Sequence, residues 1–252
     1  MLLVTWNVNS LRARLPRVLE LLAELAPDVV CLQETKCDAG GFPEAELAAA
    51  GYASHHHGAG RWAGVAILAR DGLALEDPSC GLPGERAPDE ARFCEATVGG
   101  LRVASAYVVN GREVGSTWFA DKLAFLDAVR ERAAALDVIA GDFNVAPADE
   151  DVYDPAAFAG ATHVTDAERS RLRAILDTGM VDAYRALHPG ERQFTWWDYR
   201  AGHFHKGYGL RIDLALLRSP GVAERLRACG IARDYRKGAK PSDHAPLLVE
   251  LA

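Results

Sequence analysis

Apolar runs of strand length alternate with amphipathic runs of helical spacing along the whole chain, and no other feature restricts its fold as strongly. Strands are predicted at residues 2–8, 28–32, 64–69, 101–109, 138–140, 211–217 and 246–251. Helices are predicted from residue 11 to just before Pro27, from about 116 to 136, and from a capping-box sequence at Thr165 to about 178. Strands and helices mixed in this order predict an α/β protein.

The length of the chain and its lack of linkers predict a single domain over residues 1–252. A compact chain of this length buries roughly 70–75% of its unfolded surface, so it needs no disulfide or zinc ion for stability. Five cysteines without a C-x-x-C pair are typical of a reducing cytoplasm. The N-terminal apolar stretch is too short for a signal peptide, and no segment approaches the ~18 apolar residues of a membrane span. We therefore expect a cytoplasmic monomer with no membrane partner, associated with the nucleoid if the source is prokaryotic.

The net charge of −7 argues mildly against nucleic-acid binding when it is taken alone. The argument is limited because affinity follows local basic patches, and because acidic metal ligands lower the net charge. One basic run contains Arg233, Arg236, Lys237 and Lys240, with only Asp234 opposing it. From composition alone, this run is interpreted as a solvated loop.

Hydrophilic side chains repeatedly stand where an apolar run stops, namely Asn7, Glu34, Asp142, Asn144, Asp213, Asp243 and His244. Taken singly, such residues are usually turn residues, helix caps or surface groups. Strands of one sheet lie about 5 Å apart, however, so residues at neighbouring strand ends can converge. Asp213 is harder to explain as a turn residue, because a carboxylate inside an apolar strand is costly unless it is paired or metal-bound. We hypothesise that His244 is its partner.

Carboxylates together with Asn amides favour a hard cation as the bound metal. Mg²⁺ prefers oxygen ligands and keeps several waters, and Mn²⁺ remains open as a substitute. Zinc is disfavoured because the Cys and His residues lack its usual spacings. The tract His55-His56-His57 is interpreted as a polar loop or strand edge, because successive strand residues face opposite sides and cannot easily bind one ion.

Eight segments resemble, in order, the signature blocks of the exonuclease III-type abasic endonucleases, part of the endonuclease/exonuclease/phosphatase superfamily that includes DNase I. They are TWNVNSLRAR (5–14), LQETK (32–36), GVAIL (64–68), AYVVNGREVGS (106–116), GDFNVAP (141–147), FTWWDYR (194–200), GLRID (209–213) and SDHAP (242–246). LQET, GDFN and SDH mark only the superfamily, whereas NVNSLRAR, TWWDYR and GLRID narrow the resemblance to the abasic endonucleases. The resemblance implies a four-layer α/β sandwich, with two mixed β-sheets face to face, helices outside, and the site at one rim.

The resemblance further implies which residues bind the metal ion. Glu34 is the principal Mg²⁺ ligand, with Asn7 and Asn9 beside it, and Asp243 is an acid on the metal side. The metal-side set as a whole is Asn7, Glu34, Asp142, Asn144, Asp243 and His244.

Catalytic roles follow from the same resemblance. Asp142 matches a candidate general base, and Asn144 in the same turn holds the attacking water or a phosphate oxygen. His244 contacts the scissile phosphate with Asp213 as its carboxylate partner, although His244 is also the alternative candidate for the base. Tyr107 donates to a phosphate oxygen or stabilises the leaving group.

Residues that recognise damaged DNA are implied in the same way. Trp196, Leu210 and Ile212 match an apolar pocket for a flipped-out abasic sugar, which has lost its stacking and therefore costs less to extrude than an intact nucleotide. In the Trp196–Trp197 pair, one ring is predicted to be core. The residues implied to contact the DNA backbone or groove are Asn9, Asn110, Arg112 and Arg200.

The implied function is Mg²⁺-dependent hydrolysis of the phosphodiester 5′ to abasic sites in double-stranded DNA, with 3′→5′ exonuclease activity and cleaning of recessed or blocked 3′ ends. Two residues depart from the family pattern: Val109 replaces a proline, and Gly207 replaces an asparagine. Neither departure touches the expected metal or water chemistry.

A superfamily phosphatase acting on a non-DNA phosphoester would share Glu34 and Asp142 but would not need FTWWDYR or GLRID. A non-catalytic scaffold predicts decay of the polar set, which is intact.

Overall fold

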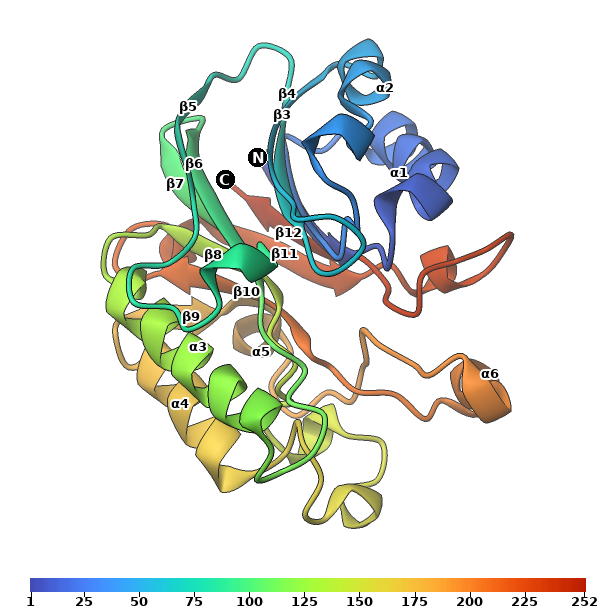
Figure 1. Cartoon of the computed structure of the whole chain (residues 1–252), viewed down its shortest axis with the longest axis vertical. Coiled ribbons are helices and arrows are strands. Elements are labelled where there is room, and N and C mark those ends of the chain that lie inside the picture. Colours follow the sequence, from blue (N-terminus) through green and yellow to red (C-terminus); the bar gives the residue numbers. More distant parts are fainter.

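The computed structural model describes all 252 residues and contains two six-stranded mixed sheets packed face to face (Figure 1). The first sheet has the order β11 (Leu226–Ile231), β12 (Leu247–Leu251), β1 (Leu2–Asn7), β2 (Val29–Gln33), β4 (Val65–Arg70) and β3 (Tyr52–His57). The second sheet has the order β5 (Leu75–Cys80), β6 (Phe93–Val98), β7 (Leu101–Tyr107), β8 (Val138–Asp142), β10 (Asp213–Arg218) and β9 (Met180–Asp182). Only β1–β2 and β7–β8 are parallel pairs.

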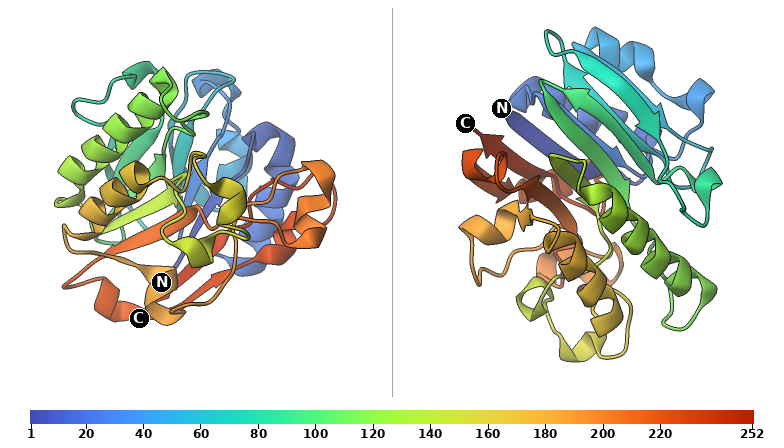
Figure 2. Two further views of the ribbon diagram at one scale, coloured as in Figure 1. Left: turned by 90° about the horizontal axis from the view of Figure 1, so that it is seen from below. Right: turned by 90° about the vertical axis from the view of Figure 1, so that its left-hand side faces the viewer.

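Helices on the outer faces of the two sheets complete four layers (Figure 2). These are α1 (Leu11–Leu25) and α2 (Glu44–Ala49) on the first sheet, and α3 (Thr117–Ala133) and α4 (Asp166–Leu176) on the second. Two short helices lie elsewhere: α5 (Ala183–Leu187) packs against the core between the sheets, and α6 (His203–Lys206) lies on a loop (Figure 1). The apolar face of α1 packs on the first sheet, and α3 and α4 pack on the second. The four-layer α/β sandwich expected from the resemblance is therefore confirmed. None of the helices combines the length and the apolar character needed to cross a membrane.

The core between the sheets is built from every second residue of the central strands. Leu3, Val29, Val138 and Leu217 belong to this core, while their immediate neighbours face the outer helices. Side chains alternate along a strand, so every second residue of these strands faces the space between the sheets up to the strand end. The inward-facing residues at the strand ends therefore lie at one rim of this core.

Most predicted elements are confirmed, with ends shifted by up to three residues, and the capping box forms between Thr165 and Glu168. Five strands were not predicted, namely β3, β5, β6, β9 and β11. The edge strands β3 and β5 were missed because their YASHHH and LEDPSC sequences lack an apolar face. The histidine tract is a strand edge, as expected: His55 and His57 contact carbonyls of Ser79 and Phe93, whereas His56 contacts Thr35 on the other side.

The topology separates the chain termini from the strand ends that carry polar residues. The Met1 amino group donates to the Leu251 carbonyl oxygen at 2.7 Å, so both termini lie at one rim (Figure 1). The C-terminal ends of β1, β2 and β8 and the first residues of β10 and β12 lie at the opposite rim. The polar residues predicted at strand ends therefore share one edge of the sandwich.

Candidate active site

The inter-sheet face turns from apolar to polar as the central strands approach the rim. Tyr107 on β7, Asp142 on β8 and Asp213 on β10 are in register across the second sheet. Asn7 on β1 and Gln33 on β2 are in register in the facing sheet. Each is the last inward-facing position of its strand at this rim, so sheet register alone brings them together.

A buried polar layer separates this rim from the apolar core. The Gln33 side-chain amide donates to Thr5 Oγ1 at 3.1 Å and to Ser105 Oγ at 3.0 Å, which joins the two sheets. The Ser105 hydroxyl in turn donates to the Leu32 carbonyl at 3.0 Å. A buried donor or acceptor that loses its hydrogen-bond partner costs about 1–3 kcal/mol of folding free energy. These hydrogen bonds therefore favour the one packing of the two sheets in which every partner is present.

Asn7 bridges the two carboxylates of the rim. Its Nδ2 donates to Glu34 Oε1 at 2.8 Å and to Asp142 Oδ2 at 2.9 Å. Its Oδ1 accepts from the backbone N–H of Asn9 at 3.0 Å. The side-chain NH₂ group, and not the side-chain oxygen, therefore faces the two carboxylates. Asn9 also donates from Nδ2 to Asp243 Oδ1 at 2.9 Å, which ties the N-terminal segment to the SDH segment.

The GDFN turn holds Asp142 and Asn144 at the end of β8. A Cβ at Gly141 would lie 1.9 Å from the Ala106 carbonyl oxygen, so only glycine allows β7 and β8 to approach so closely here. Asn144 has a left-handed φ of 51°, which curls its backbone N–H to 2.9 Å from Asp142 Oδ1. Burial raises the pKa of Asp142, and the nearby His244 opposes this only in part. Asp142 is therefore a stronger base than an exposed aspartate.

The hypothesised pairing of Asp213 with His244 is present: His244 Nδ1 lies 2.8 Å from Asp213 Oδ2, and both residues are buried. This leaves His244 Nε2 facing Asp142, 3.8 Å from its Oδ2. Burial alone lowers the pKa of His244, but the carboxylates of Asp213 and Asp142 outweigh this and raise it. The imidazole is therefore protonated near neutral pH and can donate to an anion.

The SDH segment is fixed from three directions. Ser242 Oγ donates to the Asn7 carbonyl at 2.7 Å, and Trp6 Nε1 donates to the His244 carbonyl at 3.0 Å. Arg236 donates to the carbonyls of Ser242 at 2.9 Å and Trp197 at 3.2 Å. The solvated-loop interpretation is therefore wrong for Arg236, which is only 6% exposed, because its guanidinium satisfies carbonyls that the SDH and TWW segments leave unpaired.

The donor set at the rim fits a hard divalent cation. Glu34 and Asp142 each offer a carboxylate oxygen, and these oxygens and a ring nitrogen of His244 all lie within 4.8 Å of one another. Lys36 Nζ lies 2.6 Å from Glu34 Oε2 and is the cation nearest to that carboxylate, while Asp213 Oδ1 is buried without a hydrogen-bond partner. Carboxylates held so close together repel one another unless a cation lies between them, and oxygen ligands of this kind suit Mg²⁺ or Mn²⁺.

A cavity of about 160 Å³ opens between these groups. Nine of the ten residues that line it were predicted from the sequence: Glu34, Tyr107, Asn110, Asp142, Asn144, Trp196, Ile212, Asp243 and His244. The tenth, His163, was missed, because a lone histidine between an alanine-rich loop and a helix cap has no distinguishing pattern. Its Nδ1 contacts the Asn144 carbonyl oxygen. Burial, reinforced by Lys122, lowers the pKa of His163 to about 4, so the ring is neutral.

The predicted sugar-pocket residues lie at different depths. Trp196 and Ile212 line the cavity, and Trp196 Nε1 donates to Asp243 Oδ2 at 3.1 Å. Leu210 is fully buried behind them and does not line the cavity. Trp197 is only 1% exposed, which confirms that one ring of the pair is core.

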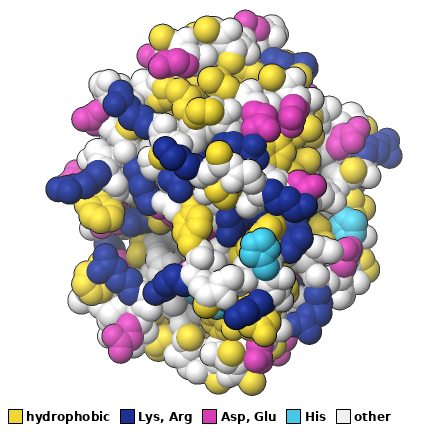
Figure 3. Space-filling view, turned by 90° about the vertical axis from the view of Figure 1, so that its right-hand side faces the viewer, with side chains coloured by type: hydrophobic (Ala, Val, Ile, Leu, Met, Phe, Trp, Pro, Cys, Tyr) yellow, Lys and Arg dark blue, Asp and Glu magenta, His cyan; other side chains and the backbone are white.

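Of the residues predicted to contact the DNA backbone or groove, only Asn110 lines the cavity. Asn110 Nδ2 donates to Asn144 Oδ1 at 3.3 Å, and Arg112 and Arg200 are exposed. Arg200 forms an ion pair with Asp198 at 2.8 Å. Figure 3 shows Lys and Arg side chains gathered across the face that carries α6 and the 233–240 segment, although the net charge is −7.

Burial and the nearby Glu34 carboxylate raise the pKa of Tyr107, so its phenol stays protonated and can donate.

Comparison with known proteins places this site among phosphoester hydrolases. The sequence model of the endonuclease/exonuclease/phosphatase family matches residues 4–244. Exodeoxyribonuclease III of Haemophilus influenzae is 30% identical, over 98% of this chain and 98% of its own length. A 3′ phosphatase from Neisseria bound to a product DNA hairpin superposes with a TM-score of 0.95 at 38% identity, covering 100% of this chain and 99% of its own. An AP endonuclease from Archaeoglobus fulgidus superposes with a TM-score of 0.94 at 36% identity, with coverage of 100% and 99%.

Proposed function

Because this chain belongs to the endonuclease/exonuclease/phosphatase family, we propose that it is a DNA repair nuclease that hydrolyses phosphoester bonds with the help of Mg²⁺. Its substrates are the phosphodiester 5′ to an abasic site in duplex DNA and recessed or blocked 3′ ends. The observation that carries this proposal is the convergence of Glu34, Asp142 and His244, from separate strand ends, on one cavity. Full-length similarity to an exodeoxyribonuclease III and to an AP endonuclease supports DNA as the substrate.

The proposed ion-binding group centres on Glu34 and Asp142, with Asn7, Asn9, Asn144 and Asp243 around them. The ion, when bound, offsets the negative charge of the phosphate and of the leaving oxygen. Asn7 orients both carboxylates through its amide group, since one Nδ2 donates to each of them. Mn²⁺ is expected to substitute, because it accepts the same oxygen ligands.

The chain's own side chains supply the proton transfers. Asp142 accepts a proton from the attacking water as the water oxygen bonds to phosphorus, and the phosphorus–O3′ bond breaks. Protonated His244 donates to a phosphate oxygen and stabilises the charge that develops there, with Asp213 holding the ring. The 2.8 Å contact with Asp213 favours Asp142 over His244 as the base, because it keeps His244 protonated. Tyr107 donates its phenolic proton toward the phosphate or the leaving oxygen.

Removal of a 3′ phosphate is a second candidate for the main activity, and the size of the cavity favours it. Cleavage 5′ to an abasic site and release of a 3′ phosphate break the same kind of phosphorus–O3′ bond. They differ in what lies beyond the phosphate: a deoxyribose with its chain in the first case, and only water in the second. The cavity is only about 160 Å³ and has His163 in its wall, which suits the smaller group. Similarity to a 3′ phosphatase supports this candidate as well.

The test compares three duplexes: one with an internal abasic analogue, one with a 3′ phosphate, and one with an undamaged recessed 3′ end. Each is incubated with Mg²⁺ or with EDTA. We expect cleavage only with Mg²⁺, and the ratio of the three rates identifies the main activity. Asp142→Asn should lower turnover by roughly 10²–10⁴-fold while DNA binding persists. Asp127→Asn, which removes a surface ion pair with Arg171, is the matched control. Undiminished cleavage in EDTA, or by Asp142→Asn, would refute the proposal.

A further inference from the structure

Two of the five tryptophans are exposed beside the site, although nothing in the fold requires them there. Trp62 is 74% exposed and Trp118 is 44% exposed, whereas Trp6 and Trp197 are buried. Trp62 lies between β3 and β4, and Trp118 lies in the first turn of α3. An exposed indole leaves a large apolar ring face in water, so a pair of them beside a cavity indicates a binding surface.

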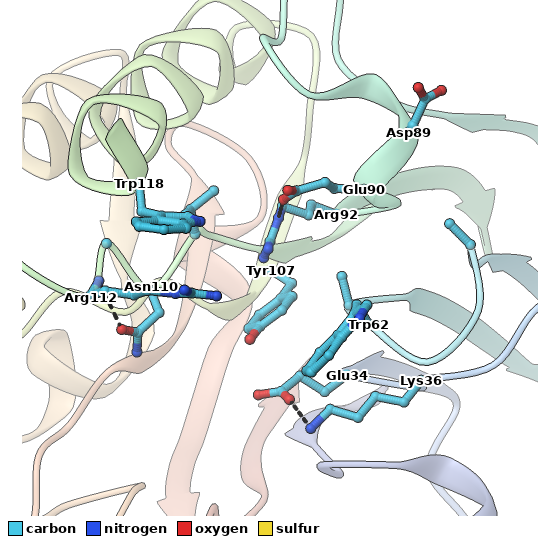
Figure 4. A pocket seen from close by; sticks show the side chains of 14 residues that line it. Glu34, Lys36, Trp62, Asp89, Glu90, Arg92, Tyr107, Asn110, Arg112 and Trp118 are labelled. Atoms are coloured by element: carbon cyan, nitrogen blue, oxygen red, sulfur yellow. Dashed lines mark hydrogen bonds and ion pairs between the residues drawn. The ribbon is translucent and has the colours of Figure 1, made fainter. Parts of the chain in front are cut away.

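Both rings line a second cavity of about 450 Å³, which also contains Glu34, Tyr107 and Asn110 of the site cavity. Figure 4 shows Trp62 and Trp118 on either side of Tyr107, with Glu34 and Lys36 next to Trp62. The volume lies within the roughly 300–1,000 Å³ of ordinary small-molecule sites. A group bound between the rings is therefore an immediate neighbour of the groups that surround the scissile phosphate.

The charges around this second cavity suit one nucleotide with its phosphate at one end. The Arg112 guanidinium stacks on Trp118, 4.1 Å from the ring centroid, and makes no hydrogen bond within the protein, so its donors are free for a phosphate. At the opposite edge, Asp89 and Glu90 disfavour a phosphate, and Glu90 is already paired with Arg92. A phosphate is therefore favoured beside Arg112 and disfavoured beside Asp89 and Glu90. The space between the two indole rings then suits an uncharged aromatic group.

We propose that the tryptophan platform (Trp62 and Trp118) stacks unpaired nucleobases of the DNA strand next to the scissile phosphate. The proposal rests on the proposed function, because it specifies the DNA that the same site takes: an end or lesion with at least one unstacked nucleotide beside it. Bases inside a duplex are already stacked on their neighbours, so only an unpaired base gains from the platform. Stacking is indifferent to sequence, because every base has an aromatic face.

The proposal is tested by binding rather than by cleavage. Wild type, Trp62→Ala/Trp118→Ala and Trp62→Phe/Trp118→Phe are titrated in EDTA with a fully paired duplex and with the same duplex carrying three unpaired nucleotides. The overhang is placed at the 3′ end or at the 5′ end, and it contains 2-aminopurine, whose fluorescence is quenched by stacking. Leu187→Ala, another exposed apolar residue that lines neither cavity, is the matched control.

We expect wild type and the Phe variant to quench 2-aminopurine in one of the two overhangs. The Ala variant should lose the quenching and bind that overhang about 5- to 100-fold more weakly, with unchanged affinity for the paired duplex. Equal losses on paired and unpaired DNA would mean that the rings contact the duplex itself and would overturn the proposal, as would no loss on either. Cleavage of the fully paired abasic duplex by wild type tests the nuclease function separately.

Discussion

His163 forms one wall of the site cavity with its backbone in the left-handed region, at a φ of 80°. Its Nδ1 contacts the Asn144 carbonyl oxygen, which also accepts from Lys122 Nζ at 2.6 Å. The imidazole is thus held by the same turn that carries Asn144. Because it lies beside Trp196 and Ile212, it limits the space for a sugar beyond the phosphate.

Replacing His163 should shift the balance between substrates. His163→Gly suits the positive φ and removes the ring, so we expect kcat/KM for the abasic duplex to rise about 10-fold relative to that for the 3′ phosphate, on the scale of small changes in pocket size. Steady-state kinetics on both duplexes measures the ratio. His163→Asn, which tolerates the same φ and keeps a donor near Asn144, should change the ratio less. If His163→Gly left the ratio of the two kcat/KM values unchanged, His163 could not be the residue that limits the space for a sugar.

Among the secondary-structure elements, the segment that leads into β10 is held by a buried ion network. Arg211 follows Leu210 and precedes Ile212, and its fully buried guanidinium donates to Asp151 at 2.6 Å and Asp182 at 2.8 Å. The contacts join this segment to β9 and to the turn before residue 152. They fix the segment that carries Ile212 and Asp213 at the rim.

Breaking this network should destabilise the whole protein. Arg211→Met leaves the Asp182 carboxylate without its ion-pair partner and leaves Arg185 as the only cation at Asp151, so we expect the free energy of unfolding to fall by about 3–5 kcal/mol. Urea denaturation followed by circular dichroism measures it. Arg200→Met removes an arginine whose side chain is 87% exposed, and the loss there should stay within about 0.5 kcal/mol. Similar losses in the two variants would contradict a special role for the buried network.

Glu95 on β6 couples its strand to α3 and β7. It accepts from Arg132 Nε at 2.8 Å and from Arg102 Nη2 at 2.6 Å. Burial alone raises the pKa of Glu95, but the two guanidinium groups outweigh it and lower the pKa. A carboxylate whose pKa is lower when folded adds stability above its unfolded pKa of about 4.3, and this stability is lost as pH falls through the folded value.

Glu95→Gln should therefore have a pH-dependent cost. We expect the variant to be less stable than wild type at pH 7 by about 1–3 kcal/mol, and the difference to shrink as the pH falls below about 4. Denaturant titrations between pH 3 and 7 follow it. Glu131→Gln, which removes an exposed pair with Arg130, should show no comparable trend. A difference that grew toward acid would reverse the assigned sign.

On the scale of the whole molecule, the site lies between two sheets that each contribute a carboxylate. Glu34 follows β2 in the first sheet, and Asp142 ends β8 in the second. The Asn7 amide joins them, but their like charges still repel across the interface. A divalent cation bound between them should therefore stabilise the packing of one sheet on the other.

Thermal unfolding should report this coupling. With Mg²⁺ at about 100 times its Kd, we expect the folded state to gain about 2.7 kcal/mol over the protein in EDTA, seen as a higher Tm. Glu34→Gln should lose most of this gain, and in EDTA its stability should stay close to that of wild type, because the repulsion from Asp142 and the ion pair with Lys36 are lost together. Glu76→Gln, on the edge strand β5, should respond to Mg²⁺ as wild type does. The same Mg²⁺ response in Glu34→Gln would argue against an ion at this rim.

Local spacing in the sequence was sufficient to predict most strands, three helices and the polar residues at the rim. Strand alternation and helical periodicity depend only on near neighbours, so they are visible without tertiary structure. The surroundings of Val109 and Gly207 explain why these residues are tolerated where the family pattern has proline and asparagine. Gly207 has a φ of 73°, where glycine and asparagine are the residues best tolerated, and Val109 is buried in the apolar cluster beneath α3.

What the sequence determined by itself is therefore the α/β class, the position of the central strands and the identity of most of the oxygen-bearing residues. Only the tertiary structure decided that His163 lines the cavity, that Arg236 is buried beneath the SDH segment, and that Arg211 pairs with two distant aspartates. The physical reason is that these contacts join segments that are far apart in the chain. Their energy depends on burial and on partners supplied by the packed sheets, and neither leaves a trace in the spacing of neighbouring residues.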